Sequence, residues 1–236
     1  MSEYDEYCYI DNKYKTKKFK PSEKYYQVKY DRDTWRRLFP RPKPTITLDY
    51  RNLKLTNIGR YSIMKERIAH EILGYIKKNY KKNFNKAIIT DTNGGLGGFT
   101  LTASQYVQKI NSVEILPIHY KYLVNNIGVY GINNVNVFND DYMKIMMRLK
   151  QDIVFADPPW GGYNYREQKV ISLGFNNVNI VCLCNKLGEK NKTKLFTFLA
   201  PANFDLKFFK EHLLHGKIIV YNLRNKLKSL LIIVIF

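Results

Sequence analysis

The sequence predicts an α/β fold in which helices cover both faces of a mostly parallel sheet. Three observations favour it. Between residues 63 and 156 the chain alternates short apolar runs with longer amphipathic segments, which is the pattern of β-α-β units. A glycine-rich turn, residues 94–98, follows one of the apolar runs. Another run ends in Asp157-Pro158-Pro159-Trp160-Gly161-Gly162, and open α/β sheets bind ligands where their strands end.

The individual elements follow from periodicity. Apolar side chains recur at helical spacing over residues 63–80, with Ser62 as a candidate N-cap. Further helices are expected at 100–110 and 117–129; strands are expected at 87–90, at a run ending at 112–114, at 135–138, at 152–156 and at 230–236. The segment 176–187 favours a strand by its local composition.

Composition and charge restrict the class of partner. The chain has 236 residues, 45% of them hydrophobic, and a formal net charge of +19, which indicates a globular protein that binds a polyanion, with RNA or DNA ahead of a membrane. The alternative is a solvated basic surface or the Lys bias of an AT-rich genome.

The three cysteines, Cys8, Cys182 and Cys184, show no paired spacing, so we expect no disulfide framework and no metal site. The amino terminus is polar and the apolar run at 230–236 is too short to span a bilayer. We therefore expect a cytoplasmic or nuclear protein, of cellular or viral origin, that acts as a monomer without a membrane partner.

Residues 1–60 are predicted to form a basic, aromatic-rich extension, followed by one domain at 61–236. Residues 11–60 contain fifteen Lys or Arg against five acids, with aromatic side chains interleaved and three prolines at 40–44. Basic groups contact phosphates and aromatic rings stack on bases, so the mixture suits a nucleic-acid-binding arm. The alternative is a solvated linker with a few aromatic rings docked on the core.

The turn after residues 87–90 is predicted to bind a ligand. Its sequence, residues 91–100, runs from an acid through four glycines in five positions to the start of a helix, and glycine allows a ligand to approach the backbone closely. It lacks the Gly-Lys-Ser/Thr of a phosphate loop and the spacing of a dinucleotide fingerprint.

Acidic side chains follow the next two strands. Glu114 is placed to accept both hydroxyls of a ribose, and Asp140 or Asp141 could accept from an adenine amino group. As alternatives, Glu114 is an exposed acid that precedes a helix, and Asp140 or Asp141 is the helix cap before Tyr142.

The Asp-Pro-Pro-Trp-Gly-Gly segment is the most specific feature. Two prolines stiffen the backbone after a strand and keep Asp157 out of the helical region. The Asp157 carboxylate and the Pro158 carbonyl can then accept from an amino group of a base that stacks on Trp160. The alternative is a turn at the edge of the sheet with a packed Trp.

Together these segments resemble a class I S-adenosylmethionine-dependent methyltransferase. More narrowly, they resemble the trimethylguanosine synthase family, which methylates the exocyclic N2 of the 7-methylguanosine cap of RNA. The resemblance covers roughly residues 29–235 and rests on these segments: 91–100, Glu114, Asn125-Asn126, 129–132, Asp141 and 157–162, with 37–39, 66–69, 199–203 and 225–228. It implies a seven-stranded Rossmann-like sheet, S-adenosylmethionine as cofactor, capped RNA as partner and no metal.

The resemblance also implies the site residues. The cofactor-binding candidates are Asp91, Asn93, Gly95, Gly97, Thr100, Glu114, Asp141 and Asp157. The catalytic candidates are Asp157, Pro158 and Trp160. The substrate-binding candidates are Trp160, Tyr165, Phe39, Lys29 and Asn203, where Tyr165 and Phe39 would supply the second side of a stacking sandwich or have structural roles instead.

The chain departs from the family pattern at three places. Asp157 stands where the family commonly has Ser, and Ala202 stands where it has Arg, so another basic residue would have to grip the cap. The family would place a helix near residues 176–187.

The implied chemistry needs no strong base. The lone pair of guanine N2 is delocalised into the ring, and acceptors on its two N–H bonds localise it. A cationic 7-methylguanine gains about 1–2 kcal/mol from cation–π stacking on Trp160. Two alternatives stay open: a methyltransferase that acts on an internal guanine N2 or adenine N6 of RNA or DNA, which Asp157 favours, and a non-catalytic nucleic-acid-binding module.

Overall fold

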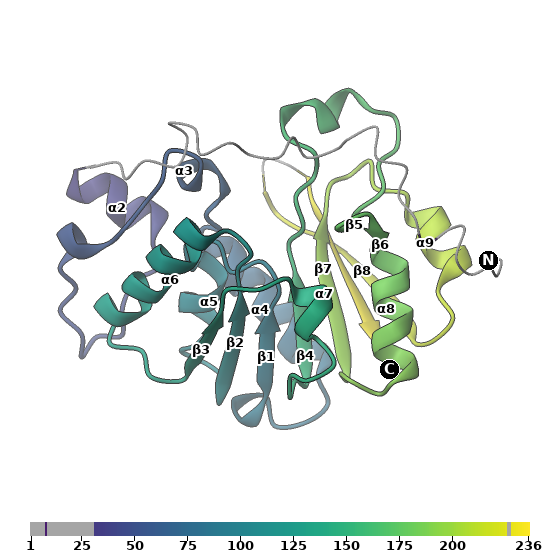
Figure 1. Ribbon diagram of the computed structural model, residues 1–236, viewed down its shortest axis with the longest axis horizontal. Helices are drawn as coiled ribbons and strands as arrows, with labels where there is room; N and C mark the ends of the chain where they lie inside the picture. Colours follow the sequence, from purple (N-terminus) through teal and green to yellow (C-terminus); the bar gives the residue numbers. More distant parts are fainter. Residues whose placement is uncertain (1–7, 9–30, 226–227) are drawn as a thin grey trace. The chain divides into compact units, whose positions relative to one another are not determined.

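Seven strands form the sheet, in the order β3-β2-β1-β4-β7-β9-β8. The structure is a computed structural model that describes residue 8, residues 31–225 and residues 228–236 (Figure 1). Neighbouring pairs among β1, β2 and β3 are parallel, as are β4 and β7, whereas β9 runs antiparallel to both β7 and β8. The predicted mostly parallel, seven-stranded α/β fold is therefore confirmed.

The described residues divide into two compact units, one within residues 20–151 and one that contains Cys8 and residues 152–236. The helices and strands of the first unit are α2 (Arg32–Leu38), α3 (Gly59–Ser62), α4 (Glu66–Asn79), β1 (Ile88–Asp91), α5 (Gly98–Ala103), β2 (Lys109–Val113), α6 (Pro117–Val129), β3 (Val135–Phe138) and α7 (Tyr142–Ile145), with short 3-10 helices η2 (Tyr50–Asn52) and η3 (Phe84–Lys86). Those of the second are β4 (Ile153–Ala156), η4 (Tyr163–Glu167), β5 (Gly174–Phe175), β6 (Val178–Asn179), α8 (Ile180–Glu189), β7 (Leu195–Ala200), α9 (Leu206–His212), β8 (Lys217–Asn222) and β9 (Leu230–Ile235).

Two predicted elements of the first unit have other bounds. The helix expected at 63–80 starts at Glu66, because Ser62 already ends α3 and Lys65 is the N-cap residue, so Ser62 is not its cap. The helix expected at 100–110 starts earlier, at Gly98, and stops at Ala103. In contrast, α6 and β3 have the predicted bounds.

The predicted boundary at residue 60 does not coincide with a structural boundary. Side chains from residues 35–63 and from residues 96–130 form one hydrophobic core. Its members are Trp35, Leu38, Phe39, Leu48, Leu53, Leu55, Ile63, Leu96, Leu101, Leu123, Ile127 and Tyr130. Residues 31–60 are therefore part of the first unit and cannot be removed without opening its core.

Two neighbouring asparagines of α6 fix this amino-terminal segment. Asn126 is fully buried; its Oδ1 accepts from the Lys54 N–H (2.7 Å) and its Nδ2 donates to the carbonyl oxygens of Lys54 (3.1 Å) and Leu96 (3.1 Å). Asn125 donates to the carbonyl of Asn52 (2.8 Å). Asn126 thus joins the amino-terminal segment to the glycine-rich turn that contains Leu96.

The second unit resolves the conflict over residues 176–187 in favour of a helix. Asn176 and Asn177, both with positive φ, turn the chain between the antiparallel β5 and β6. The Asn179 side chain then accepts from the Val181 N–H (3.1 Å) and caps α8, which buries most of its side chains. The local strand prediction was wrong because residues 180–184 are a short continuous apolar run, and such a run does not distinguish a buried strand from a buried helix.

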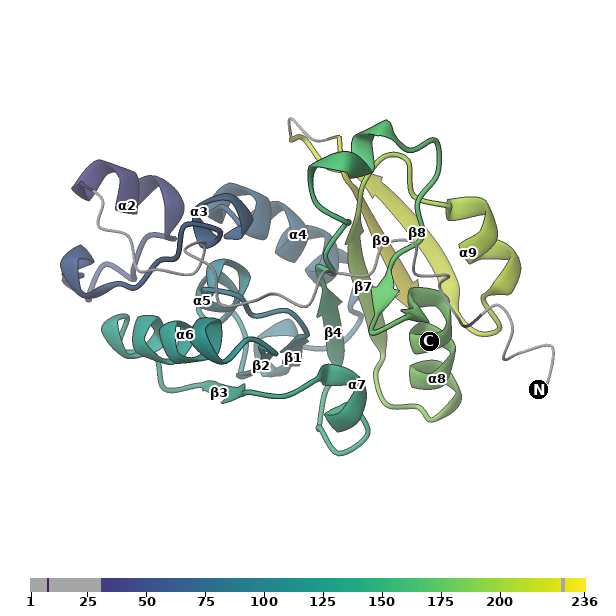
Figure 2. The same cartoon turned by 45° about the horizontal axis from the view of Figure 1, so that its top comes forward.

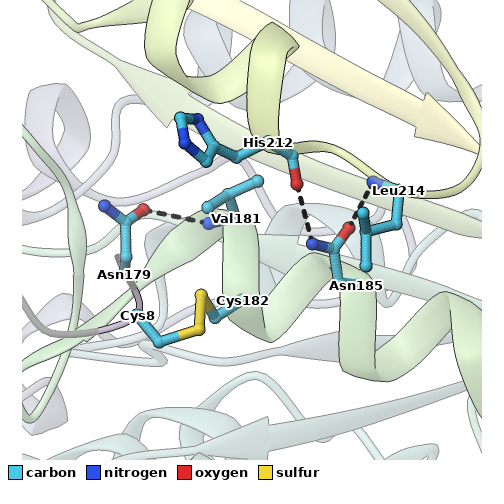
Figure 3. Close-up of a disulfide and its surroundings, with 7 residues drawn as sticks. All are labelled: Cys8, Asn179, Val181, Cys182, Asn185, His212 and Leu214. Carbon is cyan, nitrogen blue, oxygen red and sulfur yellow. Dashed lines mark hydrogen bonds between the residues drawn. A yellow bond between two sulfur atoms is a disulfide. The ribbon is translucent and has the colours of Figure 1, made fainter. Parts of the chain in front are cut away.

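A disulfide joins Cys8 to Cys182 of α8, 174 residues apart (Figure 3). The expectation of no disulfide was wrong, because spacing along the sequence says nothing about two cysteines that tertiary folding brings together. Cys184 is free and buried. On the same helix, Asn185 donates to the His212 carbonyl (2.9 Å) and accepts from the Leu214 N–H (2.9 Å), which fixes the end of α9 (Figures 2 and 3). Within the part of the chain that is described, no helix is long and apolar enough to cross a bilayer.

The disulfide predicts a thiol count. Of the three cysteines, only Cys184 should react with a thiol reagent in denaturant without reductant, and a Cys184→Ala variant should show no reactive thiol. Reduction should lower the free energy of unfolding by about 2–4 kcal/mol, because the unfolded chain regains the entropy of a long closed loop. Three reactive thiols in the unreduced protein would show that the bond does not form.

Candidate functional site

The glycine-rich turn lies between β1 and α5, at the carboxyl end of β1. The Gly94 N–H donates to the Val113 carbonyl (2.8 Å), so the turn is tied to the end of the neighbouring strand β2. The Gly97 N–H donates back to the Gly94 carbonyl (2.9 Å) and closes the turn. The turn is therefore held in place by backbone hydrogen bonds and does not depend on a ligand for its shape.

A glycine is favoured at each of the four positions for a different physical reason. A β-carbon on Gly94 would collide with the Ser112 hydroxyl, and one on Gly98 with the backbone of Met64. Gly97 has φ +103°, with the Leu101 and Leu123 side chains close by. Gly95 has φ +53° and faces open space, with only the Asn93 carbonyl oxygen near, at 3.8 Å. Gly95 is thus the glycine whose bare backbone a ligand can approach.

Asp91, the last residue of β1, is buried behind the turn. Its carboxylate accepts from the Thr100 hydroxyl (2.7 Å) and from the Asn93 N–H (3.2 Å). Thr100 is also buried and within 2.8 Å of the Ser112 hydroxyl, so its side chain is used to orient Asp91. Burial raises the pKa of Asp91 to about 6, although these hydrogen bonds lower it in part.

Glu114 directly follows β2 and contacts the turn. Its Oε2 accepts from the Gly95 N–H (2.8 Å) and its Oε1 from the Leu116 N–H (2.7 Å). Only 7% of Glu114 is exposed, so the interpretation as an exposed acid is wrong. Burial raises the pKa of Glu114, and the Asp91 charge raises it further.

Ile115, next to Glu114, is not among the residues predicted from the sequence. It is 54% exposed although it is apolar. An apolar residue directly after an acid that ends a strand is the sequence feature that could have identified it.

Asp141 has the capping role that the sequence left open. Its Oδ1 accepts from the Met143 N–H (2.9 Å) at the start of α7. Asp140 accepts from the Arg148 guanidinium (3.2 Å). These contacts account for the two acids within the fold, and a contact of Asp141 with a ligand stays a prediction.

The Asp157–Gly162 segment follows β4 and ends in two glycines with positive φ. Asp157 and Trp160 are partly exposed, while Pro158 is buried. The Trp160 and Tyr165 rings meet edge to face, with centroids 5.2 Å apart and an interplanar angle of 83°. A base cannot lie between two rings in this arrangement, so Tyr165 does not form the second side of a sandwich here. The Trp160 Nε1 is buried and has no hydrogen-bond partner among the described residues.

Asn203 holds the loop that follows this segment. Its Nδ2 donates to the carbonyl oxygens of Tyr165 (2.7 Å) and Gln168 (2.8 Å). The amide is therefore committed to the backbone of residues 165–168, and through it Asn203 positions the ring of Tyr165. A contact of Asn203 with the substrate stays a prediction.

Two predicted substrate-binding residues lie elsewhere. Phe39 is 2% exposed and packs 5.5 Å from Trp35 in the core of the first unit, so its ring is not available to a base and that prediction was wrong. The structural role that the sequence left as the alternative for Phe39 is the one found. Lys29 lies outside the described residues.

Known proteins share the pattern of both segments. The family model described as RNA cap guanine-N2 methyltransferase matches residues 86–233, which contain both the glycine-rich turn and the Asp157–Gly162 segment. The chain is 29% identical over 195 residues to trimethylguanosine synthase of Schizosaccharomyces pombe, covering 80% of this chain and 74% of that protein. It is 37% identical over 139 residues to uncharacterized protein L320 of Acanthamoeba polyphaga mimivirus, covering 58% of this chain and only 54% of the relative.

Solved structures share the fold. A Thermus thermophilus 16S rRNA N2 G1207 methyltransferase, solved with AdoMet and guanosine, has a TM-score of 0.55 at 11% identity, covering 71% of this chain and 42% of that one. A hypothetical protein, also of Thermus thermophilus, has a TM-score of 0.55 as well, at 16% identity, covering 85% of this chain and 99% of that one. At these identities the likeness concerns the fold alone.

Gly95 and Gly131 form a matched pair for testing the turn. Both have positive φ (+53° and +61°) and neither has a nearby atom that would clash with a β-carbon beyond ordinary contact. Gly95→Ala and Gly131→Ala should therefore cost similar backbone strain. Only Gly95→Ala should weaken S-adenosylmethionine binding, by about tenfold or more, in equilibrium titration. Equal S-adenosylmethionine affinities in the two variants would show that the cofactor does not bind at this turn.

Asp91 predicts a pH dependence of stability. Its pKa is raised from 3.8 to about 6, so the folded protein holds this proton more tightly than the unfolded chain. Its contribution to the free energy of unfolding is therefore full below about pH 4 and is lost as pH rises through about 6, a fall of about 3 kcal/mol. Urea unfolding at pH 4 and pH 7 should show a smaller fall for Asp91→Asn than for the wild type.

The control has the opposite sign. The Thr34 N–H lowers the pKa of Asp31 at the start of α2, so Asp31→Asn should remove stability that is gained as pH rises. If the free energy of unfolding depended on pH in the same way for the wild type and for Asp91→Asn, Asp91 would not have the raised pKa that its burial implies.

Proposed function

Because the chain belongs to the RNA cap guanine-N2 methyltransferase family, we propose that it transfers a methyl group from S-adenosylmethionine to the exocyclic N2 of the 7-methylguanosine cap of RNA. The observation that carries the proposal is the match over residues 86–233, which spans the turn at Gly95 and the Asp157–Gly162 segment in one family pattern. The similarity to a trimethylguanosine synthase over 80% of the chain supports the same substrate.

The first unit has the features that fit the cofactor. The Cα of Gly95 faces open space although its N–H donates to Glu114. Glu114 presents a buried carboxylate at the end of β2, and the exposed Ile115 side chain offers an apolar surface beside it. A carboxylate at this position can accept ribose hydroxyls, and an apolar surface suits an adenine ring. When bound, S-adenosylmethionine supplies an electrophilic methyl group on a cationic sulfur.

The second unit supplies the residues for the base. The Asp157 carboxylate and the Pro158 carbonyl would accept from the two N–H bonds of guanine N2, so that the nitrogen lone pair localises for attack. As the new C–N bond forms, the methyl–sulfur bond would break with its electron pair staying on sulfur, so that S-adenosylhomocysteine leaves as a neutral thioether. The nitrogen would become positive and lose one proton to the Asp157 carboxylate or to water. No base of high pKa is needed, because the acidity of the nitrogen rises as it is alkylated.

Trp160 would bind the base by stacking. Burying an indole N–H without a hydrogen bond costs about 1–3 kcal/mol, so packing stability alone does not account for a Trp at this position. A 7-methylguanine ring is cationic and gains a cation–π term on Trp160 that guanine lacks. The preference for a cap over an unmethylated nucleotide follows from this difference.

Residues 31–60 would contribute positive charge toward the RNA. The segment's exposed basic residues are Arg32, Arg36, Arg37, Arg41, Lys43, Arg51 and Arg60. Trp35 and Phe39 are buried, and Tyr50 is partly buried with the Arg36 guanidinium 5.8 Å from its ring centroid. This surface is therefore suited to phosphates more than to stacking on bases. A second candidate function is methylation of an internal guanine N2, which Asp157 favours because the family commonly has Ser there.

Trp160 and Asp157 variants decide between the two substrates. Trp160→Ala should abolish transfer while S-adenosylmethionine affinity stays nearly unchanged. Trp160→Phe should keep a fraction of the activity, and its discrimination between 7-methyl-GTP and GTP should shrink, because a cation–π term of about 1–2 kcal/mol corresponds to about 5- to 30-fold. Asp157→Ser should retain more activity than Asp157→Ala. Transfer is measured on both nucleotides for every variant.

An enzyme for internal guanines would give the opposite pattern. Its wild type would not prefer 7-methyl-GTP, and Asp157→Ser would be severely impaired. Equal wild-type rates on 7-methyl-GTP and GTP would reject the cap as substrate, and the absence of S-adenosylmethionine binding would favour a non-catalytic binding module.

A further inference from the structure

A cluster of exposed lysines lies at the end of the first unit that is opposite to the glycine-rich turn. We define the amino-edge lysine surface as Lys77, Lys81, Lys82, Lys86 and Lys109, all of which are exposed. They come from the last turn of α4, the segment that joins α4 to β1, and the first residue of β2 (Figure 1).

The strand register fixes where this surface lies. Ile88 pairs with Lys109 at the start of β1 and β2, whereas Asp91 pairs with Ser112 where the same strands end. At about 3.3 Å per residue, the lysines therefore begin about 10 Å behind the turn, on the amino side of the sheet. They do not belong to the proposed cofactor site.

The backbone under these lysines is fixed. Tyr80 and Phe84 are buried and anchor the segment between α4 and β1. The Asn83 side chain accepts from the Asn85 N–H (3.1 Å), and the Gln108 and Lys109 N–H groups both donate to the Ala87 carbonyl (3.2 and 3.4 Å). The backbone that carries Lys81, Lys82 and Lys86 is thus anchored, and Lys109 lies next to the residue that follows Lys86.

The segment that carries most of these lysines contains no acid. Residues 72–90 contain five lysines (77, 78, 81, 82 and 86) and no Asp or Glu. Within the described ranges none of the lysines of the amino-edge lysine surface forms a salt bridge. Elsewhere Lys190 and Lys207 pair with Glu189 and Glu211. Favourable interaction with the end of a helix accounts for Lys77 but not for the four lysines beyond α4. Clustered like charges repel one another, and a polyanion removes that cost.

We infer that the amino-edge lysine surface binds the phosphate backbone of the RNA body, downstream of the cap. The inference rests on the proposed function for the identity of the RNA as substrate. Because Tyr80 and Phe84 are buried, the surface offers ammonium groups without exposed rings at these positions, so we expect contact with phosphates that is independent of base sequence. On this inference, the protein contacts phosphates of the RNA body in addition to the cap.

The test compares two full-length variants with equal net charge. The surface variant combines Lys81→Gln, Lys82→Gln, Lys86→Gln and Lys109→Gln; the control combines Lys190→Gln, Lys207→Gln, Lys210→Gln and Lys217→Gln, all exposed residues of the second unit. Each lowers the net charge from +19 by four, to +15. Binding of an uncapped 20-nucleotide single-stranded RNA is titrated across a salt series, and transfer is measured on 7-methyl-GTP and on the same RNA with a cap.

The surface variant should lose about tenfold or more in RNA affinity at low salt, and its salt slope should fall by about 3, since each lost contact to single-stranded RNA removes about 0.7. Its KM for capped RNA should rise while kcat and KM for 7-methyl-GTP stay unchanged. A salt slope equal to that of the control would overturn the inference. The inference would also fail if the surface variant lost as much affinity for anionic lipid vesicles as it loses for the RNA. If the wild type fails to methylate 7-methyl-GTP, the proposed function fails, and the slopes on uncapped RNA still decide this inference.

Discussion

The buried side chain of Asn126 is the contact on which the arrangement of the first unit depends. It satisfies both backbone groups of Lys54 and the carbonyl of Leu96, so one residue of α6 holds the amino-terminal segment and the glycine-rich turn together. Replacing this fully buried amide would remove three hydrogen bonds to the backbone, each of which contributes about 0.5–1.5 kcal/mol net. Asn126 therefore links Lys54 of the amino-terminal segment to the turn, beside the turn's own backbone hydrogen bonds, and the segment that resembles an appendage in the sequence is part of the site's support.

Two buried carboxylates define the electrostatics of this turn. Asp91 and Glu114 both have raised pKa values because burial disfavours their charged forms, and the Asp91 charge adds to the cost of ionising Glu114. A ligand that carries positive charge would favour both ionised forms, and S-adenosylmethionine is cationic. Within the proposed function, the protein holds unfavourable negative charge at the turn that the bound cofactor compensates. Among the described residues, exposed positive charge is found away from these two acids, for example on arginines of residues 31–60 and on the amino-edge lysine surface.

After β4, the family pattern predicted which residues belong to the candidate site but not how their side chains pack. The pattern located Asp157, Pro158 and Trp160 on one segment, but it did not predict that Tyr165 would meet Trp160 edge to face or that Asn203 would hold the loop after them. Tyr165 and Asn203 lie far apart in sequence, and their contact arises from the packing of η4 against the turn after β7. A base-binding role for Trp160 stays a proposal that the variants above address.

Local sequence alone determined the elements whose signal is periodic and short-range: α6 and β3 have their predicted bounds because helical and strand periodicity need no distant partner. It also placed Glu114 at the end of a strand. Tertiary structure decided the rest. Phe39 is buried because the core gathers side chains from both ends of the first unit, Cys8 meets Cys182 across 174 residues, and α8 is a helix although its local composition favours a strand. Such contacts stabilise the fold only after the intervening chain has folded, so no local window of sequence contains them.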